Sequence, residues 1–389
     1  MNTNPRTTDP CPLWMFTNVF VLCLTCCLGG IVNTQAAENR SNPEGEKTAC
    51  GASNLPIVQT ESKRWTWESV EMAAPLRIVC YHPDATTAAA AMEKAVQRIR
   101  QLNDVFSDYD ANSEVRRLCD TAGSGQAVTV SEDLWRLLEL SLKFSQQTDG
   151  AFDVTVGPLS RLWRRARMSK EMPPPWRFEE ARQAVGYQFV KMDSRNRTVK
   201  LLRPGMRLDF GAVAKGYAID AALNVLRSHG VDSALVDLGG DIGLGNPPPD
   251  RPFWKIGVAP LEQGQSPTIF VQRNQCGVAT SGDRYRFVVI GGQRYSHIVD
   301  PRTGIGLTEQ SEVTVIAPNA TLADIFATAV SVLGPEKGLA WIDTLPETAA
   351  LYLRLENGQT KVLMSARWKE LSGHSSGLPQ ECESSSEAR

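Results

Sequence analysis

The 389-residue sequence lacks a surplus of charge of either sign, with 41 lysines and arginines against 43 aspartates and glutamates and a formal net charge of −2. An extended nucleic-acid interface needs a strongly basic face, so this balance argues against a nucleic acid as partner. Hydrophobic residues make up 42% and charged residues 22%, which excludes wholesale disorder, collagen and coiled coil. Anionic substrates remain open, because one lysine, a helix N-terminus or a metal can meet them locally.

Several nucleotide and metal motifs are also missing. GxGxxG and GxxxxGK[ST] do not occur, and the glycines of LGGDIGLG at residues 238–245 have the wrong order for a dinucleotide fingerprint. HExxH is absent too, which argues against a zincin. Outside the first 36 residues there is no CxxC pair, and five of the nine cysteines remain at irregular spacing, so neither a zinc knuckle nor a disulfide framework is indicated.

An uncharged apolar run from Leu13 to Val32 has about the length of a signal-peptide core. The small residues Thr34 and Ala36 suit cleavage after Ala36, so residues 1–36 are predicted to be a signal peptide, or else an uncleaved N-terminal anchor. We therefore expect an exported protein in the periplasm or cell envelope, with attachment to the inner membrane as the alternative. Lipidation is the weaker option, because no Gly, Ala or Ser precedes the cysteines of this run.

Polar segments flank the remaining chain. Residues 37–62 and 373–389 cannot bury enough apolar surface to fold, which predicts a flexible tether and a disordered tail. Residues 63–372 are left as the folded body.

The pattern within the body predicts an α+β fold, with mixed, largely antiparallel sheets and packed helices. Apolar residues at helical spacing predict helices over residues 85–106, 131–147, 214–228 and 320–333. Strands are expected over residues 76–81, 188–192, 198–202, 234–236, 254–258, 268–272, 287–290, 294–299, 313–317 and 349–353. Their close spacing and their Gly or Asp/Asn turns favour antiparallel pairing, and the strict alternation of a doubly wound sheet is missing.

The helix at residues 320–333 is apolar nearly all round, which predicts burial, yet it carries Asp324 and Thr328 four residues apart on one face. A buried carboxylate costs on the order of several kcal/mol unless it is paired or bound to a cation. Two interpretations are open. Asp324 caps another element while Thr328 bonds its own helix, or both supply oxygen ligands to Mg²⁺.

The segment LDFGAVAKGYAID, residues 208–220, predicts a strand that ends at Asp209, a sharp turn at Gly211 and a helix that begins near Ala214. Backbone N–H groups at that helix start, together with Lys215, would suit a diphosphate. The alternative is a solvated lysine, although the helix dipole disfavours a cation in the first turn.

Two further segments carry polar side chains that suit phosphate chemistry. Residues 280–282, Thr-Ser-Gly, are expected to form a hydroxyl-rich turn, and His297 is expected within a strand. His297 is either a hydrogen-bonded core residue or a general base, since its unperturbed pKa is about 6.5. Tyr109 and Phe152, in loops at residues 106–115 and 148–159, either stack on a flat ring or belong to the core.

Seven motifs, taken together and in this order, resemble the ApbE family of FAD:protein FMN transferases. The resemblance spans about residues 72–364, and the motifs that carry it read SDYDANSEV, TDGAFDVTVGPL, LDFGAVAKGYAID, LVDLGGDI, VATSGD, SHIVDPRTG and VTVIAPNATLADIFATA. The resemblance implies an ApbE-like, T-fold-like architecture and an exported, Mg²⁺-dependent enzyme. Such an enzyme cleaves FAD, attaches FMN through a phosphoester bond to a Thr or Ser of a target flavoprotein (an electron-transport subunit), and releases AMP.

By motif position, the resemblance also implies roles for individual residues. The side chains of Asp324 and Thr328 and the backbone carbonyl of Ala212 would hold Mg²⁺. His297 would be the general base for the acceptor hydroxyl. The residues that would line the FAD site are Met72, Tyr109, Ala151, Phe152, Asp153, Asp209, Lys215 and Val299. One departure from the family pattern is the segment MAAPLR, which replaces the more usual Met-Gly-Thr opening.

Two other functions compete with transfer. One is an Mg²⁺-dependent FAD diphosphatase, which gives FMN and AMP with water as nucleophile. The other is a non-catalytic exported protein that stores FAD. The presence of His297 beside Asp324 and Thr328 favours an enzyme, because storage needs neither a base nor a metal.

Overall fold

The computed structural model describes residues 61–261 and 264–373. The predicted leader, residues 37–60 of the predicted tether and residues 374–389 of the predicted tail lie outside the described residues. The first element begins at Lys63 and the last ends at Ser372. No helix in the described ranges is long and apolar enough to cross a membrane.

The described residues contain eight α-helices and fifteen strands, together with a short 3-10 turn at Tyr187–Phe189. The helices are α1 (Ala85–Phe106), α2 (Glu114–Cys119), α3 (Glu132–Gln147), α4 (Gly157–Ser169), α5 (Pro175–Gln183), α6 (Ala214–Ser228), α7 (Ala320–Asp343) and α8 (Trp368–Ser372). The strands are β1 (Lys63–Glu71), β2 (Ala74–His82), β3 (Val128–Thr129), β4 (Val190–Asp193), β5 (Thr198–Leu201), β6 (Ala234–Leu238), β7 (Asp241–Leu244), β8 (Trp254–Gly257), β9 (Phe270–Arg273), β10 (Gly277–Gly282), β11 (Phe287–Ile290), β12 (Gln293–Ser296), β13 (Ser311–Ala317), β14 (Ala349–Glu356) and β15 (Gln359–Met364).

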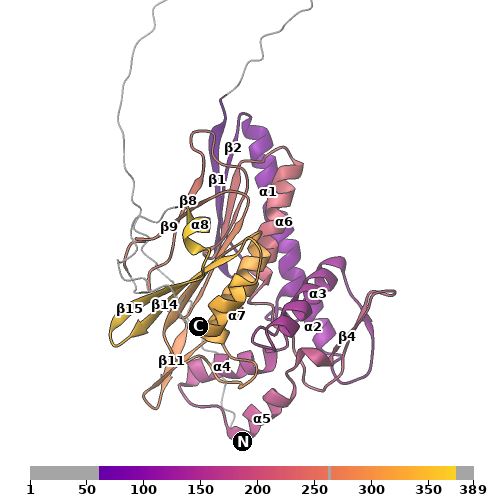
Figure 1. Ribbon diagram of the computed structural model, residues 1–389. Coiled ribbons are helices and arrows are strands. Elements are labelled where there is room, and N and C mark those ends of the chain that lie inside the picture. Colours follow the sequence, from indigo (N-terminus) through magenta and orange to yellow (C-terminus); the bar gives the residue numbers. More distant parts are fainter. Residues whose placement is uncertain (1–60, 262–263, 374–389) are drawn as a thin grey trace, which may run out of the picture. The chain divides into compact units, whose positions relative to one another are not determined.

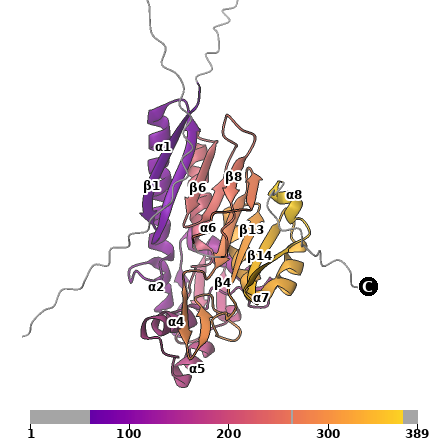
Figure 2. The ribbon, with the colours of Figure 1, turned by 90° about the vertical axis from the view of Figure 1, so that its left-hand side faces the viewer.

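Eight strands form one antiparallel sheet in the order β1-β2-β6-β7-β10-β13-β14-β15. The helices α1, α6 and α7 cover one face, and the β8–β9 pair and α8 cover the other (Figures 1 and 2). Strand β2 shows how the pleat divides its residues, because Ile78 and Cys80 join the core under the helices while Val79 joins the core under β8 and α8. The predicted α+β fold with antiparallel sheets is confirmed.

The helices predicted at residues 85–106 and 214–228 have the predicted bounds, and the helix expected at 131–147 begins at Glu132, where the Ser131 hydroxyl caps Leu134 N–H at 3.2 Å. The predicted end of the fourth helix at residue 333 is wrong in part. The helix breaks at Gly334, whose φ is 78°, but the chain resumes helical geometry after Pro335 and continues to Asp343. Proline suits the first turn of this second segment, because an N–H group at that position would have no acceptor within the helix.

Four strands of the large sheet were not predicted: β1, β7, β10 and β15. The hydroxyl-rich turn expected at residues 280–282 is wrong, since these residues end β10 between β7 and β13. A Cβ on Gly277 of this strand would lie 2.3 Å from the backbone of Asn319, so glycine here reflects close packing of α7 on the sheet rather than a turn.

Two site residues lie outside the strands in which they were expected. Asp209 does not end a strand, because the segment before it makes only an isolated parallel bridge between Val156 and Arg207. His297 follows β12 instead of lying within it, since that strand ends at Ser296. Both residues therefore belong to connecting segments, whose side chains are free to point into a cleft.

Helices α6 and α7 cap one another. Asp220 of α6 accepts hydrogen bonds from the backbone N–H groups of Ala320 and Thr321, at 2.9 and 2.8 Å, at the start of α7. In return, Asp324 of α7 accepts from Gly216 N–H, in the first turn of α6, at 3.1 Å. These bonds satisfy N–H groups that a helix start leaves without partners. The exchange fixes the first turn of α6 against the face of α7 that carries Asp324.

Gly216 allows this close approach, because a Cβ there would lie 2.3 Å from the carbonyl oxygen of Ala320. We predict that Gly216→Ala lowers the free energy of unfolding by about 1–3 kcal/mol, the usual cost of overpacking. Urea unfolding measures the change. Asn224→Ala, on the exposed face of α6, is the control and should change stability by less than about 0.5 kcal/mol. Equal stability of the two variants would show that the helices have room to separate.

Candidate active site

A cleft of about 1220 Å³ opens beside the first turn of α6. Its lining residues run from Met72 to Thr328 and include residues of α7 and of the segments that follow β10 and β12. All twelve residues to which the resemblance assigned a role line it: Met72, Tyr109, Ala151, Phe152, Asp153, Asp209, Ala212, Lys215, His297, Val299, Asp324 and Thr328. The sequence therefore identified a set of residues that the fold gathers in one place.

Asp324 and Thr328 of α7 form one wall of the cleft. One oxygen of Asp324, Oδ2, caps Gly216, while no described residue donates to Oδ1. Thr328 hydrogen-bonds no described residue, so the expected bond to its own helix is not found. Burial, with the nearby Asp241 carboxylate adding to it, raises the pKa of Asp324 to about 7. Capping and ligation are thus compatible for Asp324, because each uses a different oxygen.

The oxygen donors at this wall fit Mg²⁺. Ala212 lies in the same cleft just before α6, so a carboxylate, a hydroxyl and a backbone carbonyl are available. Asp324 has no ion pair among the described residues, and its raised pKa reflects the cost of burying its negative charge, which a bound cation would offset. No three His, Cys, Asp or Glu side chains of the described ranges cluster as metal ligands. Mg²⁺ is suited to such a site, since it is often held by one or two carboxylates, water and substrate phosphates.

Lys215, in the first turn of α6, forms an ion pair with Asp241 at the start of β7. Burial lowers the pKa of Lys215, but Asp241 and Asp324 outweigh it and raise the pKa above its ordinary value. Asp241 also accepts from the backbone N–H of Thr280 at 3.3 Å. The solvated-lysine alternative is therefore wrong. Asp241 was not singled out from the sequence as a partner of Lys215. The available signal was the segment LGGDI, in which an aspartate directly follows two glycines.

His297 presents one ring nitrogen to the backbone. Its Nδ1 lies 3.1 Å from the carbonyl oxygen of Arg286. A carbonyl only accepts, so Nδ1 carries the proton and Nε2 keeps its lone pair. Burial, and then the charges of Arg286 and Arg167, lower the pKa of His297 to about 4. The imidazole is neutral at pH 7 and has the tautomer that a base needs.

Tyr109 lies at the rim of the cleft with 76% of its surface exposed, so its assignment to the core is wrong. The guanidinium of Arg164 lies 4.4 Å from the centre of its ring. Arg164 also forms ion pairs with Asp108 at 2.6 Å and with Asp209 at 3.0 Å. Burial, together with Asp209, raises the pKa of Asp108. Sequence reasoning missed Arg164 and Asp108, because their pairing depends on the docking of α4.

Three of the other predicted FAD-site residues, Ala151, Phe152 and Asp153, line the cleft from the loop before α4. Phe152 is 2% exposed and belongs to the core, although it also lines the cleft. Asp153 accepts from the backbone N–H and hydroxyl of Thr155, at 2.8 and 2.7 Å, and from Tyr187 N–H at 2.9 Å. Burial raises its pKa. Asp153 thus shapes the loop that forms this wall of the cleft.

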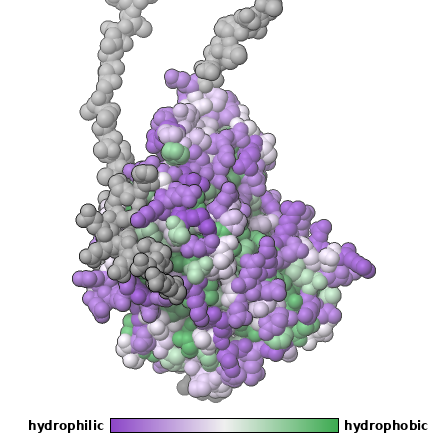
Figure 3. Space-filling model, in the orientation of Figure 1, coloured by the Kyte–Doolittle hydropathy of each residue, from purple (hydrophilic) through white to green (hydrophobic). Residues whose placement is uncertain are grey.

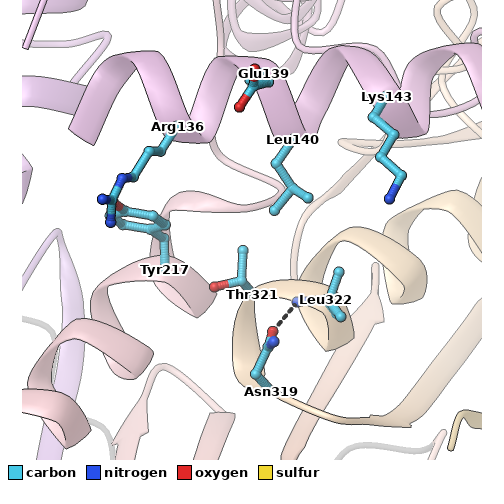
Figure 4. A pocket seen from close by; sticks show the side chains of 8 residues that line it. All are labelled: Arg136, Glu139, Leu140, Lys143, Tyr217, Asn319, Thr321 and Leu322. Atoms are coloured by element: carbon cyan, nitrogen blue, oxygen red, sulfur yellow. Dashed lines mark hydrogen bonds between the residues drawn. The ribbon is translucent and has the colours of Figure 1, made fainter. Parts of the chain in front are cut away.

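A smaller hollow of about 480 Å³ lies between α3, Tyr217 of α6 and the start of α7 (Figure 4). None of the predicted site residues lines it. The N–H groups at the start of α7 are already bonded here, to Asn319 and to Asp220. The N–H groups at this helix start are therefore not free to bind an anion in the hollow.

The three cysteines in the described ranges, Cys80, Cys119 and Cys276, are buried free thiols. Burial raises the pKa of each to about 11. None of them lines the cleft, so no thiol chemistry is indicated at this site.

Comparison with known proteins matches the model of the ApbE family to residues 72–352. The FAD:protein FMN transferase of Treponema pallidum is 36% identical over 284 residues, which cover 69% of this chain and 78% of that protein. The enzyme of the same name from Klebsiella pneumoniae is 31% identical over 297 residues, which cover 76% and 90%. Among solved structures, the ApbE protein of Thermotoga maritima superposes with a TM-score of 0.71 at 29% identity, covering 80% of this chain and all of that one. The flavin transferase ApbE from Vibrio cholerae gives 0.71 at 25% identity, covering 80% and 99%.

The lowered pKa of His297 predicts a titration in which this imidazole stays neutral from pH 8 down to about pH 5. An unfolded histidine takes up its proton near pH 6.5, so acidification between pH 6.5 and 4 should also favour unfolding. NMR of ¹³C-labelled histidine measures the titration. The chain has four histidines, and the signal that disappears in His297→Gln identifies the relevant one. A midpoint at 6.5 would contradict the burial of this ring.

Proposed function

Because this chain belongs to the ApbE family, we propose that it is an FAD:protein FMN transferase that modifies a target flavoprotein. One observation carries the proposal. The unprotonated Nε2 of His297 and the oxygens of Asp324 and Thr328 line the same cleft. That cleft, at about 1220 Å³, exceeds the roughly 300–1,000 Å³ of ordinary small-molecule sites, which suits a dinucleotide.

The reaction that this site supports is a displacement at phosphorus. A Thr or Ser hydroxyl of the acceptor gives its proton to Nε2 of His297, and its oxygen forms a bond to the phosphorus of the FMN half of FAD. The P–O bond to the AMP half breaks, and its electron pair leaves on AMP. Such transfers depend mainly on positioning and on neutralised charge, which few side chains can supply.

The oxygens of Asp324 and Thr328 and the carbonyl of Ala212 would hold Mg²⁺, which supplies positive charge to the diphosphate when bound. Lys215 adds a second charge on the same wall, held in place by its ion pair with Asp241. The flavin and adenosine would be lined by Met72, Tyr109, Ala151, Phe152, Asp153, Asp209 and Val299, with Arg164 fixing the ring of Tyr109.

The apolar leader supports export, so the acceptor would be a flavoprotein of the cell envelope, such as an electron-transport subunit. The acceptor hydroxyl separates this function from FAD hydrolysis. A diphosphatase would give free FMN and AMP at the same rate whether or not the acceptor protein is present, whereas a transferase adds the mass of FMN to the acceptor.

We predict that Asp324→Ala lowers FMN attachment at least about 100-fold, because the diphosphate loses its cation. Intact-mass analysis of an acceptor incubated with FAD and Mg²⁺ measures attachment. Glu336→Ala, an exposed carboxylate farther along α7, is the matched control and should leave attachment unchanged. Undiminished attachment by Asp324→Ala would refute the metal assignment.

We predict that His297→Ala binds FAD as tightly as the unaltered chain but loses acceptor modification by about 100-fold or more, the usual contribution of a general base. Fluorescence titration of FAD measures binding, and intact mass measures modification. His229→Ala, at the exposed C-terminus of α6, is the control. Normal modification by His297→Ala would remove its role as base, while lost FAD binding would make it a binding residue.

A further inference from the structure

Two arginines of the cleft have no acidic partner. Arg167 of α4 and Arg286, which follows β10, both line it, and neither forms an ion pair with a described residue. Neighbouring arginines do pair with carboxylates: Arg164 with Asp108 and Asp209, and Arg294 with Asp283. The charges of Arg167 and Arg286 therefore stand uncompensated beside an open space.

Packing holds both arginines close to His297. The backbone carbonyl of Arg286 accepts from the N–H of His297 at 2.9 Å and from its ring Nδ1 at 3.1 Å, so the two residues are fixed together. The β11–β12 hairpin between them packs on α4, where the ring centres of Trp163 and Tyr295 lie 5.0 Å apart. Arg167 of α4 lines the same cleft, and α4 and β11 both lie at the lower end of the body (Figure 1).

The electrostatics agree with that placement. Arg286, Arg167 and Lys215 all act to lower the pKa of His297. Burial, followed by the charge of Arg164, lowers the pKa of Arg167 itself. The charge of Arg286 also lowers the pKa of Arg167, so the two guanidinium groups repel one another, and a bound anion would relieve this repulsion. The face of the molecule in Figure 3 is largely hydrophilic, with smaller hydrophobic areas near its lower end.

The position of His297 indicates that the anion beside the two arginines is the phosphoryl group under attack. A general base lies about 2.6–3.2 Å from the oxygen whose proton it takes, and the phosphorus under attack is one bond farther. Positive groups that stabilise the negative charge on the phosphoryl oxygens therefore have to lie within a few ångströms of His297. Lys215 cannot neutralise this charge alone, because its ammonium group is already paired with Asp241 on the α6 side.

We propose that Arg167 and Arg286 bind the non-bridging oxygens of the phosphoryl group under attack and stabilise it while the bond to AMP breaks. This inference rests on the proposed function and adds two catalytic residues to it. The guanidinium group suits the task, because it stays protonated and donates several hydrogen bonds in a fixed plane. Cations preorganised around a transferring phosphoryl group act mainly in the transition state.

The test compares Arg167→Ala and Arg286→Ala with Arg165→Ala, an exposed residue of α4 that does not line the cleft. Each cleft variant should lower kcat for FMN attachment about 100-fold at saturating FAD, with KM for FAD changed less than about threefold. Arg165→Ala should match the unaltered chain. Arg167→Lys and Arg286→Lys, which keep the positive charge, should recover part of kcat. If an alanine variant does not fold, the lysine variants test the role of the arginine in its place.

A second readout does not depend on activity. NMR titration of His297 should show its pKa rising in each cleft variant, because a positive charge beside the imidazole has been removed, and unchanged in Arg165→Ala. The rise in pKa shows that the guanidinium group lies beside the imidazole, and the loss of kcat at nearly constant KM separates a role in transfer from a structural role. An unchanged kcat, or a loss confined to KM, would overturn the inference.

The outcomes also separate this inference from the function on which it rests. If the unaltered chain attaches FMN and the cleft variants match Arg165→Ala, only the role of the two arginines fails. If the unaltered chain attaches no FMN to any hydroxyl of the acceptor, the proposed function fails, and the inference fails with it.

Discussion

The exchange of caps between α6 and α7 is the contact on which the site depends. Asp220 satisfies the start of α7, and Asp324 satisfies the start of α6 through one of its two oxygens. A buried carboxylate would otherwise be costly, so this bond helps to explain how Asp324 is tolerated in an apolar helix. The same bond places its second oxygen, the hydroxyl of Thr328 and the first turn of α6 along one wall. The same aspartate therefore serves the fold and the proposed metal site, whose oxygens are positioned by the packing of the two helices.

Charge is divided between the two sides of the cleft. The α6–α7 wall combines the ion pair of Lys215 and Asp241 with the carboxylate of Asp324, which forms no ion pair with a described residue; this is the wall to which we assign the cation. The wall made by α4 and the β11–β12 hairpin carries Arg167 and Arg286, which form no ion pair with a described residue, beside the neutral imidazole of His297. This is the wall to which we assign the phosphoryl anion. In the proposed function, a diphosphate with a bound metal would complement the charge of both walls. Burial and the charges of the arginines keep the imidazole unprotonated, so Nε2 retains its lone pair at pH 7, although the same charges lower the basicity of the ring.

Much of the fold could be predicted from local signals. Residues 85–106 and 214–228 have strong helical periodicity, and the Ser131 cap is a local bond, so these helices have nearly the predicted bounds. Strands β7 and β10 were missed because their glycines reflect close packing by α6 and α7, which no local pattern reveals. The site residues were found through seven motifs in order. Asp241, Arg164 and Arg286 were missed, because their importance comes from partners, or from the lack of partners, brought together by the fold.

A crystal structure of this chain with FAD and Mg²⁺ tests the central claim most directly. The account predicts a metal between Asp324 and Thr328, with the diphosphate reaching from there toward Nε2 of His297. An FAD molecule bound elsewhere, or a cleft left empty at saturating ligand, would contradict it.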